Sequence, residues 1–296
     1  MPSKKDKPAT KITPKLLRKW ALPFPDEDGD KQARGTVLIM AGTLGMPGAA
    51  ILCAAAALRA GAGKLQIATP ETVADAVAAA VLEARVFPLS ERKAGVPSTA
   101  GLKAIEAQLE GAKAIVLGPG MQGDVKFFAS VLDEIEEATV VMDAEALRCY
   151  REKPQSVRRL GGQLIATPHA GEMAMMIDAE KDEVEANPED VAREFAKEHG
   201  TITVLKGRRT FIASPEGELF VNESGNVGLA TSGSGDVLAG IVGGLAARGA
   251  DPLQAAVWGV SLHACAGDAL EKSIGPLGYL ARELLPVIPR LMAKFK

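Results

Sequence analysis

Short apolar runs recur along the chain and are separated by longer segments that mix small, charged and apolar residues. The runs are rich in Val, Ile and Leu, and most of them end at a glycine, a proline or a polar residue. Continuous apolar runs of this kind are typical of parallel strands that are buried on both faces. The predicted strands and the turns that follow them lie in residues 35–42, 64–70, 114–120, 139–147, 163–172 and 201–207.

Several segments between and after these strands carry helix or hairpin signals. Asn187 and Asp251 are each followed by a proline, an order that is typical of a cap and the first helical position. Helices are predicted over residues 47–59, 187–199 and 251–272, and a hairpin that turns at Glu216 and Gly217 is predicted over residues 210–222.

Strands that alternate with helices predict an α/β fold, with a mostly parallel central sheet and helices on both faces. We expect one domain over residues 35–296, preceded by a basic tail and linker over residues 1–34. Ligands bind such sheets beyond the carboxyl ends of the strands, where loops from several strands meet. The segments expected to share that rim are Gly42–Gly48, Gly118–Gly120, Asp143, Thr167–Glu172, Lys206–Thr210 and Ser232–Asp236.

Charge and composition limit the classes of function. The net charge is −3 although the first twenty residues are strongly basic, so the rest of the chain is acidic and a poor candidate for binding nucleic acid. No apolar stretch is long enough for a signal peptide or a membrane span, which predicts a cytoplasmic protein. Cys53, Cys149 and Cys265 are odd in number and widely spaced, so we expect reduced thiols and no protein-bound metal centre.

The stretch ATSGSGDVLAG, residues 230–240, combines a glycine-rich turn with one acid at the start of an apolar helix. Gly233 and Gly235 allow an anion to approach the bare amides of the helix N-terminus, and Ser234 is the predicted cap. Asp236 then lies where it can take a proton from a hydroxyl that attacks a phosphoryl group. The alternative is an ordinary first-turn acid that interacts with the helix dipole.

The apolar spacing after Asp236 predicts a helix that ends near Gly249. Gly240, Gly243 and Gly244 would weaken this helix in isolation, so we expect another element to pack closely against it. The usual nucleotide motifs do not occur, since no Walker sequence and no G-x-G-x-x-G after the first strand is present. The glycine-rich turn before Asp236 is therefore the expected phosphate site.

These features together resemble the ADP/ATP-dependent NAD(P)H-hydrate dehydratases of the ribokinase-like superfamily. The resemblance covers the chain from about Gly35 to Leu291 and misses only the tail and linker. It rests on the segments PGAAILCAAAALRAGAG, VLGPGM, VMDAEAL, ATPHAGEM, VLKGRRT and GNVGLATSGSGDVLAGIVGGLAARG.

The resemblance implies a two-stage repair reaction. ADP or ATP, with Mg²⁺, phosphorylates the ring hydroxyl of the S form of hydrated NADH or NADPH, and phosphate then leaves as the ring double bond re-forms. It also implies a ribokinase-like fold and a homo-oligomer. Relatives that carry a second, epimerase domain imply a separate epimerase as a partner here.

The same resemblance assigns roles to residues. It makes Asp236 the catalytic base and a substrate contact. The other implied substrate contacts are Ala49, Gly120 and His169, and the implied nucleotide contacts are Lys206, Gly207, Arg208, Arg209, Thr210, Gly233, Ser234 and Gly235. Asn222 and Asn226 are weaker candidates for the same pocket, and Asp143 and Glu172 are candidates for holding Mg²⁺ through water.

Simpler structural readings stand beside these roles. Ala49 and Gly120 are also what close packing and a tight turn require, and His169 could be an exposed residue at a helix start. The basic segment at residues 206–210 could be a solvated turn. Many relatives have threonine at the position of Ser234 and proline at that of Val227, and the segment GDKQARG before the first strand lacks the His-Lys pair of many relatives, which puts substrate contacts there in doubt.

Two other functions remain open from the sequence. A ribokinase-like kinase of a vitamin-precursor alcohol, such as hydroxyethylthiazole, would share the late glycine-rich turn and its acid. A non-enzymatic nucleotide-binding module of the same fold is the third possibility, because fold does not determine function. The segments TPHAGE and KGRRT favour the dehydratase over both.

Overall fold

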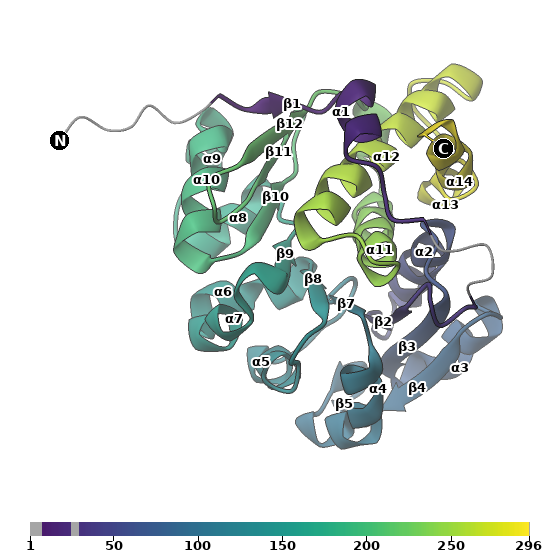
Figure 1. Cartoon of the computed structure of the whole chain (residues 1–296). Coiled ribbons are helices and arrows are strands. Elements are labelled where there is room, and N and C mark those ends of the chain that lie inside the picture. The colour runs from purple at the N-terminus through teal and green to yellow at the C-terminus, as the bar shows by residue number, and fades with distance from the viewer. Residues whose placement is uncertain (1–7, 25–29, 296) are drawn as a thin grey trace.

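The computed structural model describes residues 8–24 and 30–295. A ten-stranded, mostly parallel sheet lies at the centre of the fold (Figure 1). Only β11 runs antiparallel to its neighbours, β10 and β12. In sheet order the strands are β1 (Thr10–Lys11), β12 (Leu219–Asn222), β11 (Thr210–Ala213), β10 (Ile202–Leu205), β9 (Leu164–Ala166), β8 (Thr139–Met142), β7 (Ala114–Leu117), β2 (Thr36–Met40), β3 (Lys64–Pro70) and β4 (Arg85–Leu89). The predicted fold class is confirmed.

Helices cover both faces of the sheet because alternate side chains of each strand point to opposite sides. In β2, Val37 and Ile39 belong to one apolar cluster and Leu38 and Met40 to the other. The first face is covered by α1 (Pro14–Lys19), α2 (Pro47–Arg59), α3 (Glu71–Ala80), α11 (Ser234–Ala247), α12 (Pro252–Ser273), α13 (Ala281–Leu284) and α14 (Ile288–Met292). The second face is covered by α4 (Glu106–Gly111), α5 (Val125–Asp133), α6 (Cys149–Glu152), α7 (Pro154–Leu160), α8 (Ala170–Ile177), α9 (Lys181–Ala186) and α10 (Pro188–His199).

Most predicted elements occur where the pattern placed them. The helix over residues 47–59 has the predicted bounds, and β11 and β12 form the predicted hairpin. Asp251 caps α12, since its carboxylate accepts a hydrogen bond from Gln254 N at 2.9 Å. Asn187 holds the cap position of α10, but its side chain makes no capping hydrogen bond. A second, two-stranded sheet pairs β5 (Glu91–Lys93) with β6 (Val96–Pro97).

The glycines of α11 bring it into direct contact with α2, as expected from the sequence. A Cβ atom added to Gly240 would lie 2.2 Å from the Cys53 carbonyl oxygen, and one added to Gly244 would lie 2.3 Å from that of Ala57. Both distances are shorter than any tolerated contact, so only glycine permits this approach. The glycine-rich turn before α11 also packs against α2, since a Cβ atom added to Gly233 would lie 2.5 Å from Leu52 Cδ1.

Part of the segment predicted as a tail packs on the domain. Lys11 and Thr10 form β1, which pairs in parallel with β12, and Leu17 of α1 is only 2% exposed in the main apolar cluster. Trp258 on α12 donates its indole N–H to the Trp20 carbonyl oxygen at 2.7 Å. The strongly basic start of the tail and most of the predicted linker lie in residues 1–7 and 25–29, outside the described residues.

The cysteines are free thiols, as the sequence predicted. Burial raises the pKa of Cys53 well above its usual range and that of Cys149 to about 12, so neither is a reactive thiolate at neutral pH. Over residues 8–24 and 30–295, no helix is both long and apolar enough to cross a membrane.

Candidate active site

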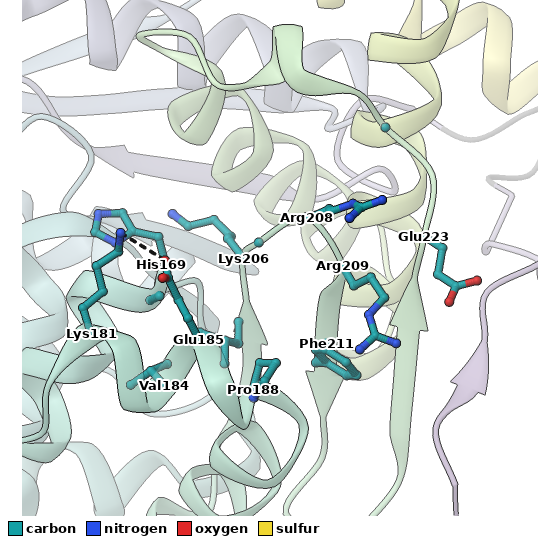
Figure 2. A pocket seen from close by; sticks show the side chains of 14 residues that line it. His169, Lys181, Val184, Glu185, Pro188, Lys206, Arg208, Arg209, Phe211 and Glu223 are labelled. Carbon is teal, nitrogen blue, oxygen red and sulfur yellow. Dashed lines mark ion pairs between the residues drawn. The ribbon is translucent and has the colours of Figure 1, made fainter.

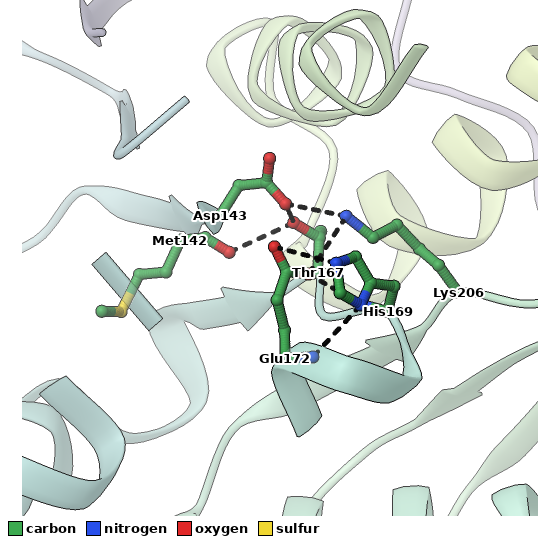
Figure 3. A network of polar contacts seen from close by, with 6 residues as sticks. All are labelled: Met142, Asp143, Thr167, His169, Glu172 and Lys206. Carbon is green, nitrogen blue, oxygen red and sulfur yellow. Dashed lines mark hydrogen bonds and ion pairs between the residues drawn. The ribbon is translucent and has the colours of Figure 1, made fainter. Parts of the chain in front are cut away.

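The carboxyl ends of the central parallel strands bring polar side chains from distant parts of the chain to one place. Asp143 follows β8, Thr167 and His169 follow β9, and Lys206 follows β10 (Figure 3). Parallel strands end at the same edge of the sheet, so loops that are far apart in sequence meet there. The rim predicted from the apolar pattern therefore exists.

Asp143 and Lys206 form the centre of this cluster. Lys206 Nζ donates a hydrogen bond to Asp143 Oδ1 at 2.9 Å and lies 3.7 Å from Glu172 Oε2. The same Asp143 oxygen is 2.7 Å from the Thr167 hydroxyl, and Asp143 is only 4% exposed. Burial lowers the pKa of Lys206, but the carboxylates of Asp143 and Glu172 raise it by more, so its pKa lies above the usual value. Lys206 is therefore a fixed positive charge on the rim.

His169 is the N-cap of α8. Its Nδ1 accepts a hydrogen bond from Glu172 N at 3.1 Å, while Glu172 Oε2 accepts one from His169 N at 2.8 Å. This reciprocal capping box fixes the direction of the imidazole and of the Glu172 carboxylate. The His169 side chain is 59% exposed, with its Nε2 3.6 Å from Glu172 Oε1, so the ring is accessible from solvent while the residue also has the structural role considered from the sequence.

The glycine-rich turn leads into α11 differently from the prediction. Gly233, with φ of +85°, is the N-cap, and Ser234 is the first helical residue. The prediction that Ser234 caps the helix is wrong, because its Oγ lies 3.0 Å from His263 Nε2 on α12 instead. A left-handed residue is needed at the turn, and glycine adopts that conformation without steric cost.

Asp236 lies in the first turn of α11 and faces the charged cluster. Burial and, to a smaller extent, the charge of Asp143 raise the pKa of its carboxyl group, Lys206 opposes the rise, and together they bring the pKa to about 6. A Cβ atom added to the neighbouring Gly235 would lie 3.7 Å from Lys206 Nζ, so the turn approaches the lysine closely. A carboxylate with this pKa is a good general base near neutral pH.

Ala49 and Gly120 face each other on the other side of the site. A Cβ atom on Gly120, where φ is +60°, would lie 2.4 Å from Ala49 Cβ. The adjacent Gly118 lies equally close to the loop after β8, because its Cβ would be 2.1 Å from the Asp143 carbonyl oxygen. Gly120 thus has a steric reason to be glycine beside Ala49, and the substrate contacts of both residues stay predictions.

A pocket of about 1040 Å³ opens beside this cluster (Figure 2). His169 and Lys206 lie at one end of it, and the guanidinium of Arg209 lies over the Phe211 ring, 5.2 Å from its centroid. Thr210 is the first residue of β11. The lining residues include Lys181, Glu185, Pro188, Gly207, Arg208, Glu223 and Gly225. The segment predicted to hold the nucleotide therefore borders a space large enough for one.

The two asparagines predicted near the pocket are occupied by local contacts. Asn222 donates to the Ser224 carbonyl oxygen at 2.9 Å. Asn226 Oδ1 accepts from the Tyr279 hydroxyl at 2.7 Å, and its Nδ2 lies 3.4 Å from Asp268. These bonds shape the loop before the glycine-rich turn.

Sequence reasoning missed the α12 residues that reach this loop and turn. His263 and Asp268 were not considered, although both contact segments of the candidate site. No sequence signal distinguishes them, because they lie inside a long helix, far in sequence from their partners.

Comparison with known proteins agrees with the reading from the sequence. A family model described as NAD(P)H-hydrate dehydratase matches residues 37–290. The ADP-dependent (S)-NAD(P)H-hydrate dehydratase of Xanthomonas campestris pv. campestris is 46% identical over 95% of both chains. The bifunctional NAD(P)H-hydrate repair enzyme Nnr of Moorella thermoacetica is 35% identical over 92% of this chain, which covers 52% of that longer protein.

A solved structure is similar over nearly its full length. It is that of the ADP/ATP-dependent NAD(P)H-hydrate dehydratase from Bacillus subtilis, co-crystallised with ATP/Mg²⁺. The TM-score is 0.83 at 31% sequence identity, and the match covers 97% of this chain and 99% of that one. The similarity therefore extends from the family pattern to the whole fold.

Proposed function

The chain belongs to the NAD(P)H-hydrate dehydratase family, and from this we infer that it is a nucleotide-dependent lyase that restores NADH or NADPH from the hydrated S form. The observation that supports this chemistry is the position of Asp236, a partly buried carboxyl group with a raised pKa beside the glycine-rich turn and Lys206. The kinase alternative is weaker, since the family model and the similar relatives are dehydratases.

In the first stage, Asp236 takes the proton of the ring hydroxyl while the hydroxyl oxygen attacks the terminal phosphorus of the nucleotide. The bond from that phosphorus to its former bridging oxygen breaks, and the shortened nucleotide leaves. The amides of Gly233 and Gly235 and the ammonium of Lys206 stabilise the negative charge on the transferred group. Water is a poor leaving group and phosphate is a good one, so this step activates the substrate.

In the second stage, the carbon–oxygen bond breaks and phosphate leaves with the bonding electron pair. The adjacent ring carbon transfers a proton to solvent water, and the electron pair of that carbon–hydrogen bond forms the ring double bond. The family resemblance assigns contact with the ring to Ala49, Gly120 and His169. We propose these as the substrate contacts.

The residues present fit a Mg²⁺ ion bound together with the nucleotide. Mg²⁺ prefers oxygen ligands and usually keeps several waters, with one or two carboxylates and substrate phosphates completing its shell. Asp143 and Glu172 supply two carboxylates near the phosphate turn, both within 4 Å of Lys206 Nζ. Among residues 8–24 and 30–295 no group of three potential ligands forms a metal site by itself. Bound there, Mg²⁺ would neutralise phosphate charge.

The partners and assembly rest on the family resemblance and stay predictions. A separate epimerase that interconverts the two hydrate forms is the expected source of substrate, by analogy with the bifunctional NAD(P)H-hydrate repair enzymes among the relatives. A homo-oligomer in the cytoplasm is expected, and exposed apolar side chains such as Leu277 and Val227, 66% and 67% exposed, offer a contact surface.

The proposed reaction is tested with hydrated NADH and Mg²⁺ in three samples, which contain ADP, ATP or no nucleotide. The near-ultraviolet absorbance of the reduced nicotinamide ring should rise only where a nucleotide is present, and the faster sample names the donor. A flat signal in all three, from protein shown to be folded, would return the kinase to consideration, and vitamin-precursor alcohols would then be tried.

The rate should also depend on pH through Asp236. The carboxylate is the active form, so kcat/KM is expected to fall about tenfold per pH unit as the pH drops below about 6. Unfolding does not explain this loss, because a carboxyl group whose folded pKa exceeds its unfolded pKa stabilises the fold as it becomes protonated. A profile that stays flat down to the usual aspartate pKa of about 3.9 would contradict the assignment.

A further inference from the structure

Residues of α12 contact the loop that leads to the glycine-rich turn at three places. Asp268 accepts hydrogen bonds from Gly225 N at 3.1 and 3.2 Å at the start of this loop. Further along, Gly267 leaves room for Leu229, whose Cγ would lie 2.7 Å from an added Cβ. At the end of the loop, His263 Nε2 lies 3.0 Å from the hydroxyl of Ser234. His263 is therefore the α12 side chain that reaches the turn itself.

His263 is neutral at neutral pH. Burial and, more weakly, the charge of Lys206 lower its pKa, a hydrogen bond to the Ser234 backbone opposes the fall, and the resulting pKa is about 4. A neutral imidazole has one N–H donor and one acceptor nitrogen, so the Nε2 atom either donates to Ser234 or accepts from it. If Nε2 donates, the serine hydroxyl can still donate its own proton to another group. If Nε2 accepts, that proton is already used.

The Ser234 hydroxyl has one proton to donate. The Ser234 residue is 5% exposed, and its Oγ has His263 Nε2 as a hydrogen-bond partner at 3.0 Å. If its proton pointed to His263, only lone pairs would face the turn, and they would repel a phosphate oxygen. If instead His263 donates, the serine proton is free to bond to a phosphate on the turn. A negatively charged ligand selects the second arrangement.

We propose that His263 is a positioning residue for phosphoryl transfer, whose Nε2–H donates to Ser234 Oγ and so directs the Ser234 hydroxyl proton toward the phosphate of the nucleotide. His263 acts only through Ser234. The proposal rests on the nucleotide site argued above, because it requires a phosphate at the N-terminus of α11.

The test compares His263→Leu with His263→Gln. Glutamine keeps an N–H donor and leucine does not. The dissociation constants of ADP and ATP are measured by calorimetry with Mg²⁺ and without hydrated cofactor. We expect His263→Leu to weaken nucleotide binding about tenfold, the effect of one hydrogen bond to a charged group, and His263→Gln to restore most of it. Lys272→Ala, a change on an exposed residue of the same helix, should leave binding unchanged.

A double-mutant cycle with Ser234→Ala tests whether His263 acts through the serine. We expect the double variant His263→Leu/Ser234→Ala to bind nucleotide no more weakly than Ser234→Ala alone. Losses that multiply would overturn the proposal, as would a His263→Gln variant that binds as weakly as His263→Leu. Thermal unfolding of each variant identifies any that fail to fold.

Two further measurements distinguish failure of the proposed role of His263 from general damage to the site and from failure of the proposed function. The KM for hydrated cofactor should be unchanged in His263→Leu, and an increase as large as that for nucleotide would mean general damage to the site. If the wild-type protein binds nucleotide but does not dehydrate the cofactor, the proposed function fails while the binding cycle still decides the role of His263.

Discussion

Replacing Asp236 with asparagine is expected to lower kcat for dehydration by about 10²–10⁴-fold, the usual contribution of a general base. The amide keeps the size of the side chain but cannot take a proton from the ring hydroxyl. Nucleotide binding should weaken little, because the glycine-rich turn and Lys206 remain. The measurement is the nucleotide-dependent rise of nicotinamide absorbance, with both substrates saturating.

A matched control separates catalysis from a simple interaction with the helix dipole. Asp190 is an exposed acid in the first turn of α10. It can interact with the helix dipole, but it does not belong to the candidate active site. Asp190→Asn should leave kcat unchanged, and both variants should change the free energy of unfolding by at most about 1 kcal/mol through the dipole. An Asp236→Asn enzyme with wild-type kcat would show that Asp236 is not the base.

Replacing Trp258 with alanine is expected to lower the free energy of unfolding by about 3–5 kcal/mol, as is typical for a buried Trp. The side chain is 1% exposed, and its ring packs edge-on against Phe295 at 5.0 Å between centroids. Its indole N–H also bonds to the Trp20 carbonyl oxygen, which ties α12 to the N-terminal segment. Equilibrium denaturation with urea measures the loss.

Trp258→Phe is the comparison for this prediction. Phenylalanine retains much of the ring contact with Phe295 but loses the donor to Trp20, so part of the loss should remain. The hydrogen bond alone accounts for about 1 kcal/mol, with a further cost for the reduced volume. A loss below about 1 kcal/mol for Trp258→Ala would mean that the N-terminal segment and the end of the chain do not pack on α12 in solution.

The fold class followed from the sequence because its signals are local. Apolar runs and capping residues depend on neighbours within a few positions, which is why the helix over residues 47–59 and the cap at Asp251 were predicted correctly. The glycines of α11 also indicated close packing correctly, because glycine weakens a helix and is usually retained there only where a neighbouring element approaches the backbone closely. The prediction for Ser234 failed because a hydroxyl at a helix start has competing partners, and here the partner comes from α12.

The sequence by itself determined which residues could carry the chemistry. In an α/β chain with parallel strands, the loops that follow the strands meet at the carboxyl edge of the sheet. The residues assigned to one rim on this basis, before their contacts were known, were Asp143, His169, Lys206 and Asp236. The family resemblance then supplied the reaction and the implied roles.

Only the tertiary structure decided how these groups act on one another. Lys206 and Asp143 are 63 residues apart in sequence, and their 2.9 Å contact exists because β8 and β10 flank β9. The pKa of Asp236 is high because the fold buries the carboxyl group next to Asp143. Burial and distances between side chains depend on packing across the whole sheet, which no local pattern specifies. The same is true of His263, whose place beside the phosphate turn follows from how α12 crosses α11.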